Sequence, residues 1–437
     1  MAQEQPSVSQ RRTVIAGMAG NILEWYDFSI YGFFALAIGE NFFPSHNAST
    51  SLIDAFGAFA AGFLMRPVGA LLFGYIGDRH GRGKALTLSV LAMAGPTFLI
   101  GVLPTYRQIG VIAPVLVVLL RLLQGLSVGG EYTTSVVFMV ERAPSKRRGL
   151  TGAFGASGTF FGVMVGSAVG TLVAWFLPTA ALLAWGWRLP FLFGISIGVA
   201  GYFLRRDLAT AEPPARPAKQ PLADIWRSQW RRVLQISGLK LLSAVGFYLM
   251  FVYSTTYLAE VVGIEKGWAM AFNTIGMAAA VLVLPLAGAL SDRVGRKPVM
   301  TIAAIAMIIF TWPLFQLLWH PDFHVPLIGQ LGFALIIAMY EGVSPSASVE
   351  AFPSSVRCSG LAISHNLVMA LFGGTAPLIA AFMIERTNYK MAPSAYLIAA
   401  AAISLLIVFT LKETARVPLS VLDEEAESAG EEVAVEA

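Results

Sequence analysis

The chain has 437 residues, of which 56% are hydrophobic and 13% are charged, and its mean hydropathy is +0.68. Soluble domains carry about 25% charged residues, so this composition excludes an ordinary soluble protein and predicts a surface that faces lipid. The net charge of +4 does not come from a cluster of basic and aromatic residues, which excludes a nucleic-acid groove. The single cysteine, Cys358, excludes internal disulfides and a cysteine-rich metal site.

The first apolar stretch follows Arg11 and Arg12 and is interrupted by Glu24 and Asp27, with no small-residue cleavage site after it. We interpret it as a retained membrane span and not as a signal peptide. In all, twelve stretches reach the length of about 20 residues that a helix needs to cross a bilayer. They are residues 14–39, 52–77, 84–103, 111–139, 150–176, 186–204, 233–260, 268–291, 298–318, 326–349, 359–384 and 391–411. Since lipid offers the backbone no hydrogen-bond partner, this predicts an all-α polytopic membrane protein.

Lysine and arginine positions indicate the side of the membrane on which each loop lies. Most of those outside the spans fall in alternate loops and in the two terminal segments, which places both termini in the cytoplasm. The long polar segment 205–232 contains a proline-rich stretch that cannot continue a helix. The predicted organisation is a cytoplasmic segment 1–13, a six-helix half 14–204, a cytoplasmic linker 205–232, a second six-helix half 233–411 and an acidic tail 412–437 that is expected to be disordered.

Two motifs occur once in each half and in the same order. Asp78-Arg79-His80-Gly81-Arg82 follows the second span, and Asp292-Arg293-Val294-Gly295-Arg296 follows the eighth. Glu141, Pro144 and Arg148 follow the fourth span with the same spacing as Glu350, Pro353 and Arg357 after the tenth. Such duplication is typical of transporters in which two six-helix units surround a site near the midplane of the membrane.

The repeated charges predict a gate on the cytoplasmic side. The aspartates can face the N-terminus of a neighbouring helix, whose dipole favours an anion. Arg82 and Arg296 can pair with Glu141 and Glu350, and these bonds must break when that side opens. The alternative is that the charges only set the topology. The predicted gate residues are Asp78, Arg79, Arg82, Glu141, Arg148, Asp292, Arg293, Arg296, Glu350 and Arg357.

Further motifs lie at residues 20–28 (GNILEWYDF), 62–69 (GFLMRPVG), 121–132 (RLLQGLSVGGEY), 185–190 (WGWRLP) and 412–414 (KET). With these, the whole chain resembles the major facilitator superfamily and, within it, the metabolite:proton symporter family of bacterial proline/betaine, citrate and α-ketoglutarate carriers. The resemblance implies two pseudo-symmetric six-helix halves, proton-coupled uptake and a place in the bacterial cytoplasmic membrane. We expect a monomer whose partners are a small-molecule substrate, protons and the lipid bilayer.

Seven ionisable residues fall inside the predicted spans. A charge at the bilayer centre costs about 2.5–3.5 kcal/mol, so these side chains must face each other or a wet cavity. They are Glu24, Asp27, Arg66, Arg121, Glu131, Lys240 and Glu341. Helical spacing places Asn21, Glu24, Asp27 and Tyr31 along one stripe of the first helix, and Arg121, Gln124 and Glu131 along one stripe of the fourth.

These stripes predict where protons and substrate bind. The proton-coupling candidates are Glu24, Asp27, Glu131 and His365, and the substrate-binding candidates are Arg121, Gln124, Tyr31, Lys240, Tyr248, Glu341 and Asn366. We expect that protonation of Asp27 or Glu24 frees Arg121 to bind a substrate carboxylate. A permanent structural ion pair is the alternative, and His365 can equally be a hydrogen-bonded packing residue. Gly158, Gly162, Gly166 and Gly170 form a ridge that is expected where the two halves slide.

The leading hypothesis is proton symport, in the direction of uptake, of a small carboxylate-bearing metabolite or zwitterionic osmolyte. The alternatives are an uncoupled facilitator or exporter and, remotely, a non-transporting sensor. An enzyme is not expected, because the two G-x-S-x-G matches, at 125–129 and 194–198, lie in apolar helices with no strand before them. No ATP site, metal site or other cofactor is expected, so the proton gradient supplies the energy.

Overall fold

The computed structural model describes residues 10–45, 47–70, 72, 82–129, 131–206, 225–320, 322 and 324–425, and the regular elements in these ranges are helices. The first half contains α1 (Gln10–Phe33), α2 (Ala35–Phe42), α3 (Ala48–Leu64), α5 (Arg82–Val102), α6 (Tyr106–Ile109), α7 (Ile112–Val128), α8 (Glu131–Glu141), η1 (Ser145–Arg147), α9 (Arg148–Phe176), α10 (Thr179–Ala181), η2 (Leu182–Gly186) and α11 (Arg188–Arg206). The second contains η3 (Ile225–Gln229), α13 (Trp230–Phe247), η4 (Tyr248–Tyr253), α14 (Ser254–Thr256), η5 (Tyr257–Val262), α15 (Lys266–Val294), α16 (Arg296–Leu318), α17 (Val325–Glu341), α18 (Ser344–Glu350), α19 (Arg357–Val368), η6 (Met369–Gly373), α20 (Ala376–Thr387) and α21 (Ala392–Thr410).

Nine helical segments in the described ranges are long and apolar enough to cross a membrane. The other three predicted spans, 14–39, 84–103 and 186–204, coincide with α1 and α2, with α5 and with α11. Large apolar side chains point outward from the bundle, as Leu282 and Leu286 of α15 do with exposed fractions of 71% and 67%. An outward apolar surface on helices of this length is the surface that a bilayer covers.

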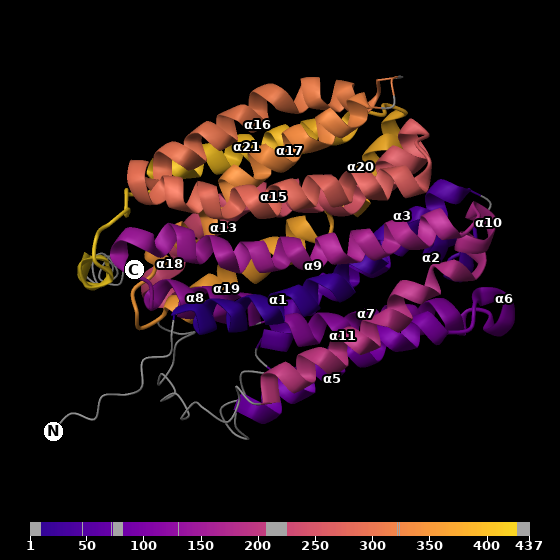
Figure 1. The fold of residues 1–437 in the computed structure, drawn as a ribbon, viewed down its shortest axis with the longest axis horizontal. Coiled ribbons are helices and arrows are strands. Elements are labelled where there is room, and N and C mark those ends of the chain that lie inside the picture. The colour runs from indigo at the N-terminus through magenta and orange to yellow at the C-terminus, as the bar shows by residue number, and fades with distance from the viewer. Residues whose placement is uncertain are drawn as a thin grey trace.

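The two halves lie against each other along α9 and α15, which are adjacent in the middle of the bundle (Figure 1). Small residues permit this approach: a Cβ on Gly288 of α15 would lie 2.4 Å from the carbonyl oxygen of Gly149 of α9. We call the end of the bundle at which α1, α9 and α16 begin the terminal end. At that end, the backbones of the two halves are in direct contact.

The glycine ridge on α9 differs in role from the sequence-based expectation. Gly158, Gly162 and Gly166 face Met18, Ile22 and Ser29 of α1, so they hold α1 close to α9 within the first half. Only Gly170 reaches the second half, where a Cβ would lie 2.9 Å from the sulfur of Met270. The ridge therefore fixes the position of the polar stripe on α1 and contributes little to the contact between the halves.

The seventh span widens into π-helical turns at η4 and η5. Two buried amide side chains hydrogen-bond to carbonyl groups of this widened segment. Asn273 of α15 donates to the carbonyl oxygen of Phe251 at 3.0 Å, and Gln330 of α17 donates to that of Met250 at 2.6 Å. Side chains that bond to backbone groups stabilise non-α turns inside a membrane. Tyr248, the first residue of η4, lies at the centre of the bundle.

The segment after α21 also differs from the expectation of disorder for residues 412–437. Residues 412–425 pack against the terminal end, and residues 419–425 are helical. The remainder, 426–437, lies outside the described residues, as do segment 1–9 and most of the linker. Of the linker, the structure describes the end of α11, η3 and the start of α13.

A Gly162→Ala substitution is expected to lower the stability of the protein, because the added Cβ would lie 2.4 Å from the carbonyl oxygen of Ile22 and would force α1 away. Overpacking of this kind costs about 1–3 kcal/mol. The measurement is thermal unfolding of the purified protein in detergent. Gly57→Ala in α3 is the matched control, because nothing lies within 4 Å of a Cβ there. Equal melting temperatures for the two variants would contradict the role of the ridge.

Candidate functional site

Aromatic side chains from both halves surround a narrow void at the centre of the bundle, which in this closed arrangement is too tight to hold a water molecule. Trp25 and Phe28 of α1, Phe59 of α3 and Tyr248 of η4 line it, together with Ser29, Val163 and Val252. The ring centroids of Trp25 and Tyr248 are 6.1 Å apart, and those of Phe59 and Tyr248 are 6.2 Å apart. A ligand at this position touches both halves, as a ligand must if its binding is to change how the halves pack.

Arg66 lies beside the void and forms an ion pair with Glu24. Its guanidinium is 3.3 Å from the carboxylate of Glu24, and both side chains are almost completely buried. The rings of Trp25, Phe28 and Phe63 lie within 5.4 Å of the guanidinium carbon. Of the two acidic candidates on the α1 stripe, Glu24 is thus the one with a buried cation as partner.

Arg121 of α7 is completely buried and has a different environment. Its guanidinium carbon lies 4.4 Å from the ring centroids of Phe28 and Tyr31, and 4.9 Å from that of Phe59. It donates to the amide oxygen of Gln124 at 2.9 Å and to the carbonyl oxygen of Phe59 at 3.5 Å. None of the carboxylates whose side chains the structure describes forms an ion pair with it. A buried cation without an anion is costly, so this guanidinium is the candidate anion-binding group.

Asp27 does not contact Arg121 directly, although their helical stripes suggested a direct pair. The Asp27 side chain points toward α5 and α11, where a Cβ on Gly194 would lie 3.0 Å from its Oδ1 atom. It is 1% exposed. The same Cβ would lie 3.0 Å from the methyl carbon of Thr97, so Asp27 and Thr97 face each other across the gap that Gly194 leaves. The Thr97 hydroxyl oxygen in turn accepts a hydrogen bond from the Gln124 amide at 2.7 Å.

A second group of the predicted residues lies nearer the terminal end. Lys240 and Glu341, both in the second half, are 3.6 Å apart. Their neighbours bridge the halves: the ring of His365 stacks on that of Tyr132 at 4.8 Å. Asn366 donates to the carbonyl oxygen of Gly129 at 2.5 Å. The Glu131 side chain lies outside the description, and neither nitrogen of His365 has a hydrogen-bond partner in the described parts of the chain.

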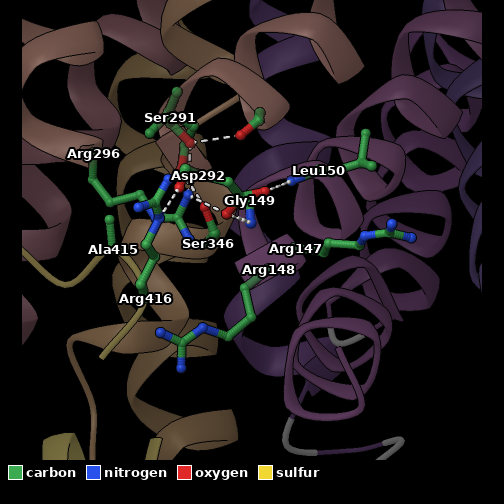
Figure 2. Close-up of polar contacts among 12 residues, drawn as sticks. Arg147, Arg148, Gly149, Leu150, Ser291, Asp292, Arg296, Ser346, Ala415 and Arg416 are labelled. Atoms are coloured by element: carbon green, nitrogen blue, oxygen red, sulfur yellow. Dashed lines mark hydrogen bonds and ion pairs between the residues drawn. The ribbon is translucent and has the colours of Figure 1, made fainter. Parts of the chain in front are cut away.

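Asp292 forms the centre of an ionic cluster at the terminal end (Figure 2). Its carboxylate accepts from the amides of Gly149 and Leu150 at 2.8 and 2.9 Å, at the N-terminus of α9 in the other half. The helix dipole and the free amides of a first turn favour an anion there. Arg296 donates to Asp292 at 2.8 Å and to Glu350 at 3.0 Å, and the latter contact is the pair that the sequence predicts.

Two further ion pairs join the halves. Arg148 of α9 lies 2.9 Å from Glu350 of α18, and Arg357 of α19 lies 2.5 Å from Glu141 of α8. Among the other predicted gate residues, Arg293 is exposed and makes none of these contacts. Asp78, Arg79 and the Arg82 side chain lie outside the described residues.

The segment 413–423 completes the cluster, which the sequence did not suggest because an acidic tail is typical of disorder. The Glu413 carboxylate accepts from the amides of Arg296 and Lys297 at 2.8 and 3.0 Å, at the start of α16. Arg148 donates to the carbonyl oxygens of Thr414 and Val417. Further contacts are those of Arg416 with the carbonyl oxygen of Asp292, of Thr414 with Glu350, and of Asp423 with Arg357. The tail therefore contacts both halves.

An Asp292→Asn substitution is expected to open the terminal end more often, because it removes a charge-assisted bond to α9 and one to Arg296. Such bonds contribute about 1.5–3 kcal/mol each, so the open population should rise about tenfold or more. The measurement is the rate at which a maleimide alkylates Ser346→Cys, at a completely buried position, in a Cys358→Ser background.

The control for this measurement is Glu425→Gln. It removes an ion pair with Lys412 in which both side chains are more than half exposed, so it should leave the alkylation rate unchanged. An Asp292→Asn rate equal to the control rate would show that the cluster does not hold the terminal end closed.

Comparisons with a family model and with known proteins agree on one family. A model described as Major Facilitator Superfamily matches residues 17–346 and 264–434. The glycine betaine/proline/ectoine/pipecolic acid transporter OusA of Dickeya dadantii is 34% identical over 425 residues, which cover 94% of this chain and 84% of that protein. The proline/betaine transporter of Escherichia coli K12 is 33% identical over 426 residues, which cover 94% and 85%.

Solved structures share the architecture. The proton:xylose symporter XylE bound to 6-bromo-6-deoxy-D-glucose superposes with a TM-score of 0.75 at 18% identity, covering 96% of this chain and 100% of that one. The inward-open XylE from E. coli gives a TM-score of 0.68 at 17% identity, covering 95% and 99%. At this identity the likeness shows the fold alone: twelve membrane-spanning helices in two six-helix halves.

Proposed function

Because the chain belongs to the major facilitator superfamily and is a multi-pass membrane transporter, not an enzyme, we propose that it takes up a small zwitterionic solute by proton-coupled symport. In this proposal the terminal end faces the cytoplasm of a bacterial cell, and the ionic cluster is the cytoplasmic gate. The concentration of lysine and arginine in the loops on that side supports this orientation.

The observation that carries the proposal is the environment of Arg121. Its guanidinium is completely buried and lies against Phe28 and Phe59, which line the central void. A solute carboxylate that enters the void supplies the anion that the described part of the protein does not. Guanidinium and carboxylate form two parallel charge-assisted hydrogen bonds, which gives both affinity and a fixed orientation.

The second group of the solute is a cation. Trp25 and Tyr248 line the void, and aromatic faces attract ammonium groups, including quaternary ones. The indole N–H of Trp25 and the hydroxyl of Tyr248 are buried without a partner in the described residues, so both are available to a ligand. The names of the relatives, which are transporters of proline and betaine, support a solute with both charges.

A solute with two or more carboxylates fits this site less well. It needs a second free cation, but Arg66 is paired with Glu24 and Lys240 is paired with Glu341. The paired charges make the inner wall of the site close to neutral, apart from Arg121. A zwitterion matches this distribution, since one charge binds Arg121 and the other lies on aromatic rings.

Asp27 is the proposed proton carrier. It is a buried carboxylate with no ion-pair partner among the described residues. An unpaired charge that moves within the membrane is costly, and a proton removes that cost. Protonation from outside, binding of the solute to Arg121 and opening of the cytoplasmic gate then follow one another as alternating access.

Membrane potential is expected to drive accumulation of a zwitterion such as glycine betaine in proteoliposomes without a pH gradient. One positive charge crossing 100 mV gains about 2.3 kcal/mol, which corresponds to roughly 40-fold accumulation. The measurement is uptake of the radiolabelled solute under separately imposed voltage and pH gradients. A facilitator would only make the internal and external solute concentrations equal. Uptake of a monoanion carried with one proton would not depend on voltage. Either result excludes zwitterion symport.

Arg121→Gln is expected to weaken solute binding at least about tenfold, because a charge-assisted bond of about 1.5–3 kcal/mol is lost. The measurement is the dissociation constant of the purified protein for glycine betaine by calorimetry. Arg386→Gln, at an exposed arginine of α20, is the control and should bind as the original protein does. Unchanged affinity in Arg121→Gln would remove this residue from the site.

A further inference from the structure

We infer that Thr97 is a positioning residue that connects the Asp27 carboxylate to the Arg121 guanidinium through Gln124, so that the protonation state of Asp27 sets the orientation of the arginine. This inference rests on the proposed function. It explains how proton binding at Asp27 can affect solute binding at Arg121, although the two side chains do not touch.

The four side chains come from three helices and lie next to one another, and hydrogen bonds join the last three of them. Asp27 belongs to α1, Thr97 to α5, and Gln124 and Arg121 to α7, and each is at most 1% exposed. Gln124 accepts from Arg121 at 2.9 Å and donates to the Thr97 hydroxyl at 2.7 Å. The Thr97 side chain and the Asp27 carboxylate both border the gap at Gly194, but no hydrogen bond joins them in this structure, and the Oδ1 atom of Asp27 has no partner among the described residues.

Donor and acceptor counting fixes the direction of these bonds. An arginine side chain has only donors, so the Gln124 amide must turn its oxygen toward Arg121 and its nitrogen toward Thr97. The Thr97 oxygen therefore accepts, and its single proton is left for one other acceptor. In this structure it goes to the carbonyl oxygen of Met93 at 2.9 Å.

The hydroxyl proton thus has two alternative acceptors. An ionised Asp27 is a stronger acceptor than a carbonyl and draws the proton to itself, while a protonated Asp27 leaves it with Met93. When the hydroxyl turns, the lone pair that Gln124 uses turns with it. The position of Gln124, and with it that of the Arg121 guanidinium, then depends on the charge of Asp27.

Other groups around Asp27 do not offer a second route. The Tyr26 hydroxyl on the same helix donates to the carbonyl oxygen of Pro190. Gly194 of α11 presents no side chain, and Glu24, one turn away on α1, pairs with Arg66. Tyr31 faces Arg121 and donates to the carbonyl oxygen of Ala55. Within the described residues, the polar path from Asp27 to the arginine passes through Thr97.

Thr97→Val removes the hydroxyl and keeps the shape, and Thr97→Ser restores the hydroxyl. In proteoliposomes, we expect Thr97→Val to retain solute exchange but to lose the dependence of uptake on external pH. Accumulation should be about tenfold lower, because one buried hydrogen bond is lost. Thr97→Ser should recover both the pH profile and the accumulation. A purely structural role would lower the amount of folded protein without flattening the pH profile.

Asp27→Asn, measured in parallel, separates this inference from the proposed function. Full proton-driven accumulation in Asp27→Asn would reject Asp27 as the proton carrier, and the proposed coupling with it. Loss of accumulation in Asp27→Asn with an unaltered pH profile in Thr97→Val would overturn the inference alone, as would equal behaviour of the Val and Ser variants. If Thr97→Val does not fold, Gln124→Met interrupts the same path, and a normal pH profile in that variant overturns the inference.

Discussion

The cost of placing a charge inside a membrane determines most of this structure. Among the seven ionisable residues inside the predicted spans, four of those with described side chains form two pairs: Glu24 with Arg66, and Lys240 with Glu341. Asp27 and Arg121 are the exceptions, since each is buried and neither has an ion-pair partner among the described residues. Unpaired charges in such a place are stable only if something else neutralises them during the working cycle. In the proposed function, a proton on Asp27 and a solute carboxylate on Arg121 meet this requirement.

At the terminal end, charges are used as contacts between the halves, although the side chains of Asp292, Arg296 and Glu350 are almost completely buried there. Asp292 binds backbone amides of α9, and Arg148 and Arg357 reach across to Glu350 and Glu141. Each of these bonds can be exchanged for a bond to water at a modest net cost. The cluster therefore suits a contact that must break and re-form, whereas the pairs deeper in the membrane suit fixed positions.

Sequence reasoning predicted the helical spans, the two halves and the pair between Arg296 and Glu350, because repeated motifs and long apolar runs report on these directly. It did not predict that Asp27 faces α5 and α11. Helical spacing shows which residues share a stripe, but the rotation of a helix depends on its neighbours, here on the space left by Gly194. Thr97 was missed because a single threonine in an apolar helix carries no pattern. The ordered tail was missed because composition cannot reveal that Glu413 binds the start of α16.

A link between the two regions follows from where the proposed ligand-binding groups lie. Arg121 belongs to the first half and Tyr248 to the second, so a solute held by both has different contacts when the halves pivot. A ligand shifts a conformational equilibrium only by the difference in its affinity for the two states. In the proposed function, the ionic cluster sets the free energy that this difference must exceed, through its bonds to both halves and to the tail. The proposal therefore treats solute binding at the centre and closure at the terminal end as contributions to one conformational equilibrium.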